Sequence, residues 1–158
     1  DMQKHEAAKN ITFDVQESTS FNGFTGPYIL YVVARINSIL KKSTTAASGV
    51  PLHGGKVKSL KSKVKYELLN QPEEKLLLLL LVKYGEIIKK ALAEYNPSVI
   101  TRYCFDLAQQ FNDFYNKHSV LGAENKDLIG ARLQLAGAVK TVLENALGLL
   151  TIDTVEEM

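Results

Sequence analysis

The sequence predicts an all-α fold, an antiparallel bundle of four or more helices, from two kinds of observation. Apolar residues recur at helical spacing in four long segments. Proline, asparagine and glycine residues stand between these segments, where helix ends would fall. With 158 residues, 46% of them hydrophobic, the chain is long enough to bury one core. We therefore expect residues 1–158 to form a single helical domain.

Residues 1–20 show no helical period and are predicted to be an extended N-terminal segment. The first helix is expected to begin at Gly26-Pro27, because proline suits the first helical position, and to run to about Lys42. Its core stripe contains Ile29, Val33, Ile36 and Leu40. Tyr28, Tyr31 and Arg35 form a second stripe at the edge of the core, from which they could face a ligand.

Residues 43–65 break the helical pattern and are predicted to be a basic surface loop. Their first half is rich in Ser, Thr, Gly and Pro, and lysines recur through their second half, at Lys56, Lys58, Lys61, Lys63 and Lys65. Two interpretations stay open for these lysines: a solvated insertion, or a set of contacts to phosphate groups.

Three further helices follow from the pattern. The second should open at Pro72 with two acidic residues and reach about Tyr95, and its leucine run predicts a central position because it is apolar on all sides. The third should start at Asn96-Pro97 and run to about Lys117. The fourth is expected over residues 127–147, with Gly148 marking its end and the tail lying back on the bundle.

Few residues suggest chemistry. The three histidines are scattered, no cysteine and histidine cluster has metal-ligand spacing, and there is no phosphate-binding glycine loop. Cys104 lies within an apolar helical pattern and is expected to be a buried structural thiol. We therefore expect no catalytic residue, no metal and no cofactor in this chain. The longest apolar run, Leu76 to Val82, is too short to span a membrane, and the lone cysteine favours a cytoplasmic setting.

Four motifs carry a family resemblance. Residues 21–36, FNGFTGPYILYVVARI, closely resemble a signature of arginyl-tRNA synthetases that opens the helical domain after their catalytic domain. In the same order, Asp106–Tyr115, Arg132–Leu135 and Leu147–Met158 resemble further motifs of that family. The chain is thus similar to the C-terminal, DALR-type anticodon-binding domain of a class I arginyl-tRNA synthetase. Glu157 stands where the family often has a basic residue.

The resemblance implies a function. Such a domain binds the anticodon stem and loop of tRNA(Arg), and Tyr28, Tyr31, Arg35, Tyr115 and Met158 match the family's RNA-contacting positions. The parent enzyme, an arginine-tRNA ligase, uses ATP with magnesium in a separate catalytic domain, whose nucleotide-binding motifs are not in this sequence. The implied partners are tRNA(Arg) and the protein's own catalytic domain, and the implied state is a cytoplasmic monomer that, as a fragment, does not catalyse.

Structural interpretations of the same residues remain open at this point. Tyr28 and Tyr31 could be tyrosines at the core edge, Arg35 could pair with an acid inside the bundle, and Tyr115 could serve packing alone. Met158 could be a frayed chain end. Two other functions are possible in principle: a helical bundle that docks proteins, and a stand-alone homologue that binds tRNA outside any synthetase.

Overall fold

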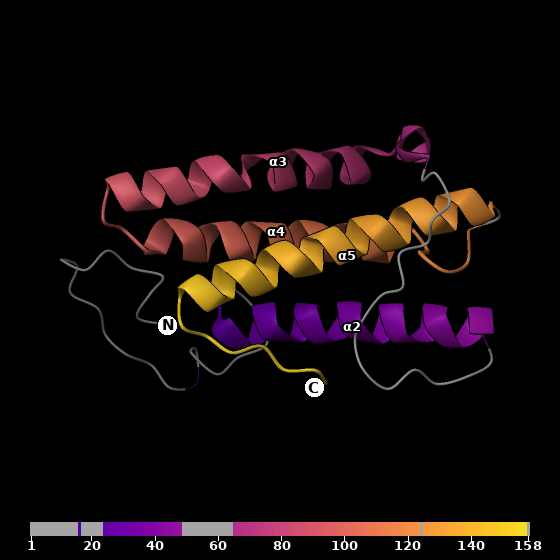
Figure 1. The fold of residues 1–158 in the computed structure, drawn as a ribbon, viewed down its shortest axis with the longest axis horizontal. Coiled ribbons are helices and arrows are strands. Elements are labelled where there is room, and N and C mark those ends of the chain that lie inside the picture. Colours follow the sequence, from indigo (N-terminus) through magenta and orange to yellow (C-terminus); the bar gives the residue numbers. More distant parts are fainter. Residues whose placement is uncertain (1–15, 17–23, 49–64, 124, 158) are drawn as a thin grey trace.

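The computed structural model describes residues 16, 24–48, 65–123 and 125–157. Its elements are α2 (Gly26–Ser48), the short 3-10 helix η2 (Tyr66–Leu68), α3 (Pro72–Ala93), α4 (Ser98–Lys117) and α5 (Lys126–Leu149). Successive helices run in opposite directions, with α2 and α3 at opposite edges and α4 and α5 between them (Figure 1). The prediction of an antiparallel, all-α bundle is confirmed for the described residues.

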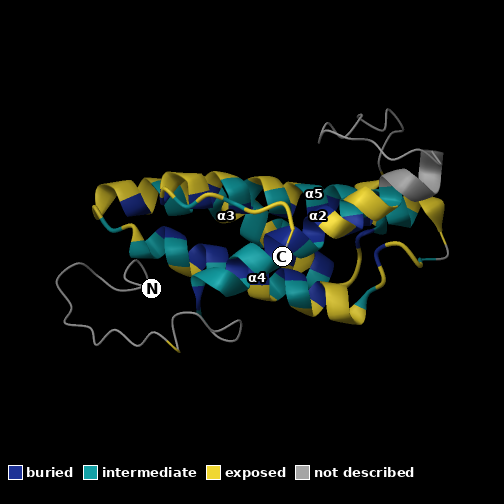
Figure 2. Cartoon of the chain, turned by 90° about the horizontal axis from the view of Figure 1, so that it is seen from below, coloured by how far each residue is buried: buried dark blue, intermediate teal, exposed yellow. Residues whose placement is uncertain are grey.

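The core lies where the helical periods of α2, α4 and α5 place it (Figure 2). Ile29, Val33 and Ile36 of the predicted α2 stripe are buried, and Leu40 is half-buried. Apolar residues at helical spacing in two later helices are buried as well, namely Ile100, Cys104, Leu107, Phe111 and Phe114 of α4 and Ala131, Leu135, Val139 and Ala146 of α5, while Val142 of α5 is half-buried. Because these spacings are local, the sequence alone identified the core side of α2, α4 and α5.

Two helix ends differ from the prediction. Helix α2 continues six residues past Lys42 to Ser48, so the first part of the predicted 43–65 loop is helical. Its threonines and alanines do not interrupt a helix, and the first glycine of the segment is Gly49. Helix α5 passes through Gly148 to Leu149, and the left-handed residue that follows is Thr151, with φ 59°. The rest of the loop, 49–64, and all of the predicted extended segment except Gln16 lie outside the described residues.

The predicted central position of α3 is wrong. Helix α3 packs on α4 and α5 and makes no contact with α2, so it forms an edge of the bundle. Its neighbours cover one side only, on which Leu77 is buried. Leu76, Leu79 and Val82 remain exposed on the other side. An all-apolar run shows that every face can be buried, but not which faces a neighbour covers.

The tail returns to α2, as predicted. The side chain of Asn37 donates an Nδ2 hydrogen bond to the carbonyl of Glu156, at 3.3 Å. The Lys41 ammonium lies 2.7 Å from the Glu157 carboxylate, and both side chains are largely exposed. Glu156 and Glu157 therefore lie beside the middle of α2.

Two acids in the first turn of α3 connect three helices at one end of the bundle. The Glu74 carboxylate is fully buried and accepts hydrogen bonds from the backbone N–H of Gln71, at 3.0 Å, and from Nε of Arg132, at 2.7 Å. Arg132 also donates to the carbonyl of Ser119, at 2.8 Å. Glu74 thus caps its own helix and ties α3 to α5.

The neighbouring acid, Glu73, ties α3 to the end of α4. Its carboxylate lies 2.6 Å from Lys117 Nζ and 3.0 Å from His118 Nε2. The hydrogen bond from Lys117, followed by that from His118, lowers the pKa of the Glu73 carboxyl from 4.5 to about 2. A carboxyl whose pKa is lower in the folded state stabilises the fold above its unfolded pKa, and this stabilisation is lost as the pH falls toward the folded pKa.

We expect the melting temperature of the Glu73→Gln variant to depend less on pH, between about pH 5 and pH 2, than that of the wild type. Above about pH 5 the wild-type chain should melt at a higher temperature than the variant, and the two melting temperatures should converge near pH 2. Thermal melts followed by circular dichroism across this range provide the test. A constant offset between wild type and variant at every pH would contradict a titrating Glu73.

Candidate nucleic-acid interface

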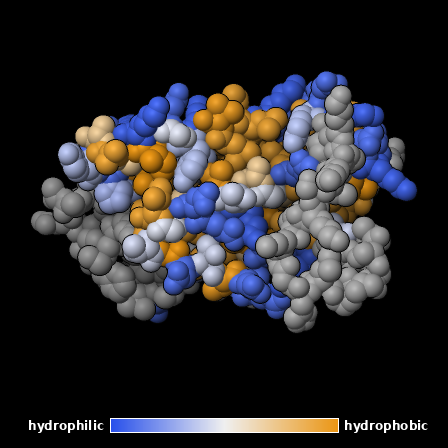
Figure 3. Space-filling view, in the orientation of Figure 1, coloured by the Kyte–Doolittle hydropathy of each residue, from blue (hydrophilic) through white to orange (hydrophobic). Residues whose placement is uncertain are grey.

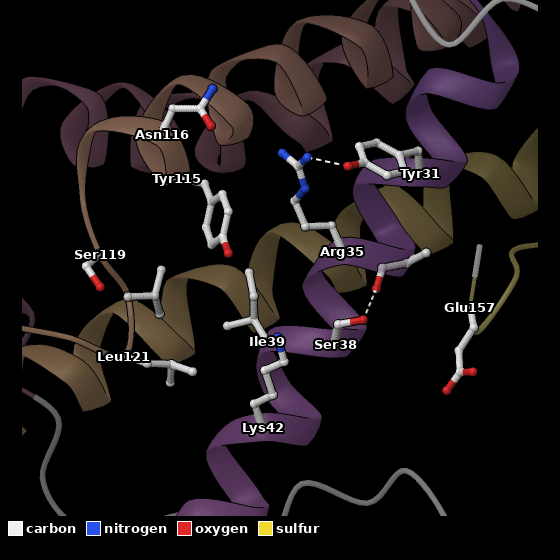
Figure 4. Close-up of a pocket in the computed structure, with 12 residues that line it drawn as sticks. Tyr31, Arg35, Ser38, Ile39, Lys42, Tyr115, Asn116, Ser119, Leu121 and Glu157 are labelled. Carbon is white, nitrogen blue, oxygen red and sulfur yellow. Dashed lines mark hydrogen bonds between the residues drawn. The ribbon is translucent and has the colours of Figure 1, made fainter.

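A pocket of about 750 Å³ opens between α2, the end of α4, the connection that follows α4, and the tail (Figure 4). Tyr31, Arg35 and Lys42 line it from α2, Tyr115 lines it from α4, and Glu157 lines it from the tail. Three residues of the predicted site, Tyr31, Arg35 and Tyr115, therefore come together around one cavity. Tyr31 and Tyr115 are far apart in sequence, and the packing of α4 on α2 brings them together.

Arg35 is at the centre of this arrangement, with its guanidinium between two aromatic rings (Figure 4). The guanidinium carbon lies 4.6 Å from the ring centroid of Tyr31 and 5.4 Å from that of Tyr115. Its Nη2 donates to the Tyr31 hydroxyl and its Nη1 donates to Oδ1 of Asn112, at 2.9 Å. Arg35 forms no salt bridge with any carboxylate among the described residues. The interpretation that an acid inside the bundle holds Arg35 is therefore not supported there.

Asn112 is a member of the site that the sequence prediction did not single out. Its amide oxygen accepts the bond from Arg35, and its amide nitrogen donates to the hydroxyl of Tyr28, at 2.8 Å. It thereby fixes the position of the guanidinium relative to the two rings. One feature of the sequence could have identified Asn112: it lies one helical turn before Tyr115, inside the Asp106–Tyr115 motif.

Tyr28 lies beside the pocket and does not line it. Its ring centroid is 5.5 Å from that of Phe105, it packs against the core, and its hydroxyl accepts the bond from Asn112. Tyr115, in contrast, is at the pocket wall, with its ring stacked on that of Phe111 at 6.3 Å. Met158 lies outside the described residues, and its neighbour Glu157 is at the pocket rim.

The pocket is suited to binding rather than to acid–base or metal chemistry. It combines two aromatic rings, a planar cation and the side-chain amide of Asn116, which are the kinds of group that bind an unpaired nucleobase. Cys104 is buried, as expected, and burial raises the pKa of its thiol to about 12. Within the described residues no cluster of three metal-ligating side chains occurs. No helix in the same part of the chain is long and apolar enough to cross a membrane.

Comparison with known proteins gives a consistent result. Residues 29–158 match the family described as the DALR anticodon binding domain. The arginine–tRNA ligase of Phocaeicola vulgatus is 38% identical over 155 residues, which is 98% of this chain and 24% of that protein. That of Clostridium beijerinckii is 40% identical over 155 residues, 98% of this chain and 25% of that protein.

A solved structure agrees with these relatives. The arginyl-tRNA synthetase of Thermus thermophilus superimposes with a TM-score of 0.78 at 33% identity, over 99% of this chain and 25% of that one. The chain thus spans about a quarter of the length of the relatives that it matches.

Proposed function

The chain belongs to the DALR anticodon-binding domain family, in the form found in arginyl-tRNA synthetases, and from this premise we propose that it binds the anticodon stem and loop of tRNA(Arg). One observation carries the proposal: the guanidinium of Arg35 lies between the rings of Tyr31 and Tyr115 at the wall of an open pocket. Unpaired bases are recognised by stacking on such rings and on arginine planes. An anticodon loop offers unpaired bases of this kind.

The residues around the pocket have different proposed roles in RNA recognition. Tyr31, Arg35 and Tyr115 provide stacking surfaces, and each stacked base contributes about 1–3 kcal/mol. Tyr28 acts indirectly, because its hydroxyl and Arg35 share the amide of Asn112. Met158, which lies outside the described residues, is proposed as a further RNA contact from the family resemblance alone. Arginine anticodons share a central cytosine, so a site that unstacks the loop and holds that base suits this tRNA.

Lysines at the rim add positive charge to that of Arg35. Lys42 lines the pocket and Lys41 lies one residue before it, bound to Glu157. Phosphates of the loop backbone would compete with the Glu157 carboxylate for Lys41. The net charge of the whole chain is only +2, so this local arrangement has to provide the attraction.

The chemistry of the parent enzyme would lie elsewhere. We propose that this chain is part of a longer cytoplasmic arginine-tRNA ligase, a monomer, whose catalytic domain activates arginine with ATP and magnesium. This chain would then contact that domain and tRNA(Arg), and would hold the tRNA without catalysing any step itself.

Binding to the anticodon stem-loop should weaken as salt rises, because lysines that contact phosphates release counterions. The logarithm of the affinity should fall linearly with the logarithm of the salt concentration, by about 0.7 for each phosphate contact to a single strand. Lys42→Ala should reduce this slope by about one contact. Lys89→Ala, on the outer helix α3, is the matched control and should leave the slope unchanged. A flat salt response in the wild type would rule out the proposed phosphate contacts.

A further inference from the structure

The connection between α4 and α5 forms one wall of the pocket around Arg35. Ser119, Val120 and Leu121 line the pocket from this connection, and Figure 4 shows Ser119 and Leu121 across the pocket from Tyr31. Val120 is buried, and Leu121 is 38% exposed. A base held in the pocket would therefore pack against residues 119–121, and the position of this wall decides how closely the base fits.

This wall has few hydrogen bonds of its own. The backbone N–H of Gly122 donates to the Ser119 hydroxyl, at 2.9 Å, and closes a local turn. Among the described residues, the one hydrogen bond that reaches residues 119–121 from another helix comes from α5, where Nη1 of Arg132 donates to the carbonyl of Ser119, at 2.8 Å. A hydrogen bond from a charged donor is stronger than one from a neutral donor. Arg132 is therefore the polar anchor of the wall.

Glu74 fixes the direction in which Arg132 donates. Its carboxylate accepts a hydrogen bond from Nε of Arg132, at 2.7 Å. Because a guanidinium is a rigid planar fork, holding Nε also holds Nη1 in its direction toward Ser119. The same guanidinium lies 6.0 Å from the ring of Phe114, the residue before Tyr115. One side chain thus contacts α4 next to Tyr115 and the connection beyond it.

The Arg132 and Glu74 pair acts from behind the pocket, because neither residue lines it. The Arg132 side chain is 9% exposed, and the Glu74 side chain is fully buried. Helix α3, which carries Glu74, contributes no residue to the pocket, and Figure 3 shows hydrophobic residues over its middle, at the upper edge of the molecule. Such a surface does not attract phosphates, so an effect of the pair on RNA binding has to pass through the connection.

We propose that Arg132, oriented by Glu74, is a positioning residue for RNA binding, which holds residues 119–121 where they complete the pocket for an unpaired base. This rests on the proposed function, in which that base belongs to the anticodon loop. A wall that shifts would fit the base less closely, since a gap of about 0.5–1 Å already forfeits about a quarter to a half of the contact energy.

Arg132→Lys tests this role. Lysine keeps a cation for Glu74, but a single ammonium does not reproduce the fork that also reaches Ser119. We expect the affinity for the tRNA(Arg) stem-loop to fall at least about fivefold, the lower end of what one stacked base contributes. The loss should be much smaller for a stem-loop with an abasic nucleotide at the central anticodon position, which offers the wall no base to contact.

A second variant removes the anchor without leaving an unpaired charge. Glu74→Gln/Arg132→Met has no donor for the Ser119 carbonyl, and we expect the same loss of affinity and the same dependence on the central base. Fluorescence anisotropy titrations of the whole 158-residue chain give the affinities. They are made below the unfolding transition of every variant, as followed by circular dichroism.

Leu143→Ala is the matched control for lost stability. Leu143 is fully buried on α5 and does not line the pocket, so its truncation weakens the core without removing the anchor of the connection. The folded control should bind both stem-loops with the affinity of the wild type. Hydrogen exchange, followed by mass spectrometry without RNA, should be faster at residues 119–122 in the two Arg132 variants than in the wild type or the control.

Three results would overturn the proposal: wild-type affinity in both Arg132 variants, an equal loss in the Leu143→Ala control, or an equal loss for the abasic stem-loop. The first would mean that the wall needs no anchor, the second that lost stability alone weakens binding, and the third that the wall does not act on the base. No stem-loop binding by the wild type would instead refute the proposed function, and with it a role of Arg132 in RNA binding. Faster exchange at residues 119–122 would then still show that Arg132 holds the connection.

Discussion

Replacing Arg132 by methionine should lower the free energy of unfolding by about 3–5 kcal/mol, the usual loss when one member of a buried ion pair is removed. The partner, Glu74, is fully buried, and the Arg132 side chain is 9% exposed. Without Arg132 the Glu74 carboxylate keeps only its bond to the Gln71 backbone, and the carbonyl of Ser119 loses its donor as well. Urea denaturation of wild type and variant measures the difference.

The double variant Glu74→Gln/Arg132→Met is the control for this interpretation. Removing both charges leaves no uncompensated carboxylate, so the double variant should lose less stability than the sum of the two single variants. A loss equal to the sum would mean that Glu74 and Arg132 stabilise the bundle independently, through packing and capping rather than as a pair.

Arg35→Met should lower the affinity for the anticodon stem-loop by about 1–3 kcal/mol, because a flexible thioether replaces the planar cation between two rings. Arg35→Lys should recover little of the loss, since an ammonium cannot stack between the rings. Stability should change less than affinity, because the buried side of α2 is formed by other residues, among them Val33 and Ile36. Fluorescence anisotropy titrations give the affinities and thermal melts give the stability.

Arg102→Met is the matched control for this variant. Arg102 also lies over an aromatic ring, with its guanidinium carbon 5.7 Å from the centroid of Phe24, but it does not line the pocket. The Arg102→Met variant should therefore bind the stem-loop with the same affinity as the wild type. An equal loss of affinity for the Arg35 and Arg102 variants would point to a general effect of charge, and the pocket would not be the binding site.

The fold could be predicted to the extent that its signals are local. The helical period identified the buried faces of α2, α4 and α5, and the proline at position 72 marked the start of α3 within one residue. The outer position of α3 could not be read in this way, because its leucine run has no polar face to indicate the solvent side. Which side was covered depended on the placement of α4 and α5.

Residues of the site could likewise be predicted only where the sequence carries a local signal or a family motif. The helical period placed Tyr31 and Arg35 on one stripe, the family resemblance added Tyr115, and the bundle places all three at one pocket. Asn112 was missed because its two partners lie 77 and 84 residues away, on another helix. Glu74 was explained locally as an acid at a helix start, although its strongest partner is 58 residues away. Long-range pairs of this kind leave no periodic trace in one sequence.

The central claim is that the pocket around Arg35 holds a base of the anticodon loop, and a double-mutant cycle between protein and RNA tests it most directly. The affinity of the wild-type chain and of Arg35→Met is measured for the tRNA(Arg) stem-loop and for the same stem-loop with an abasic nucleotide at the central anticodon position. We predict that removing the base costs the wild type about 1–3 kcal/mol and costs the variant almost nothing more, because the two changes remove the same contact. Fully additive losses would contradict the claim and place the central base outside this pocket.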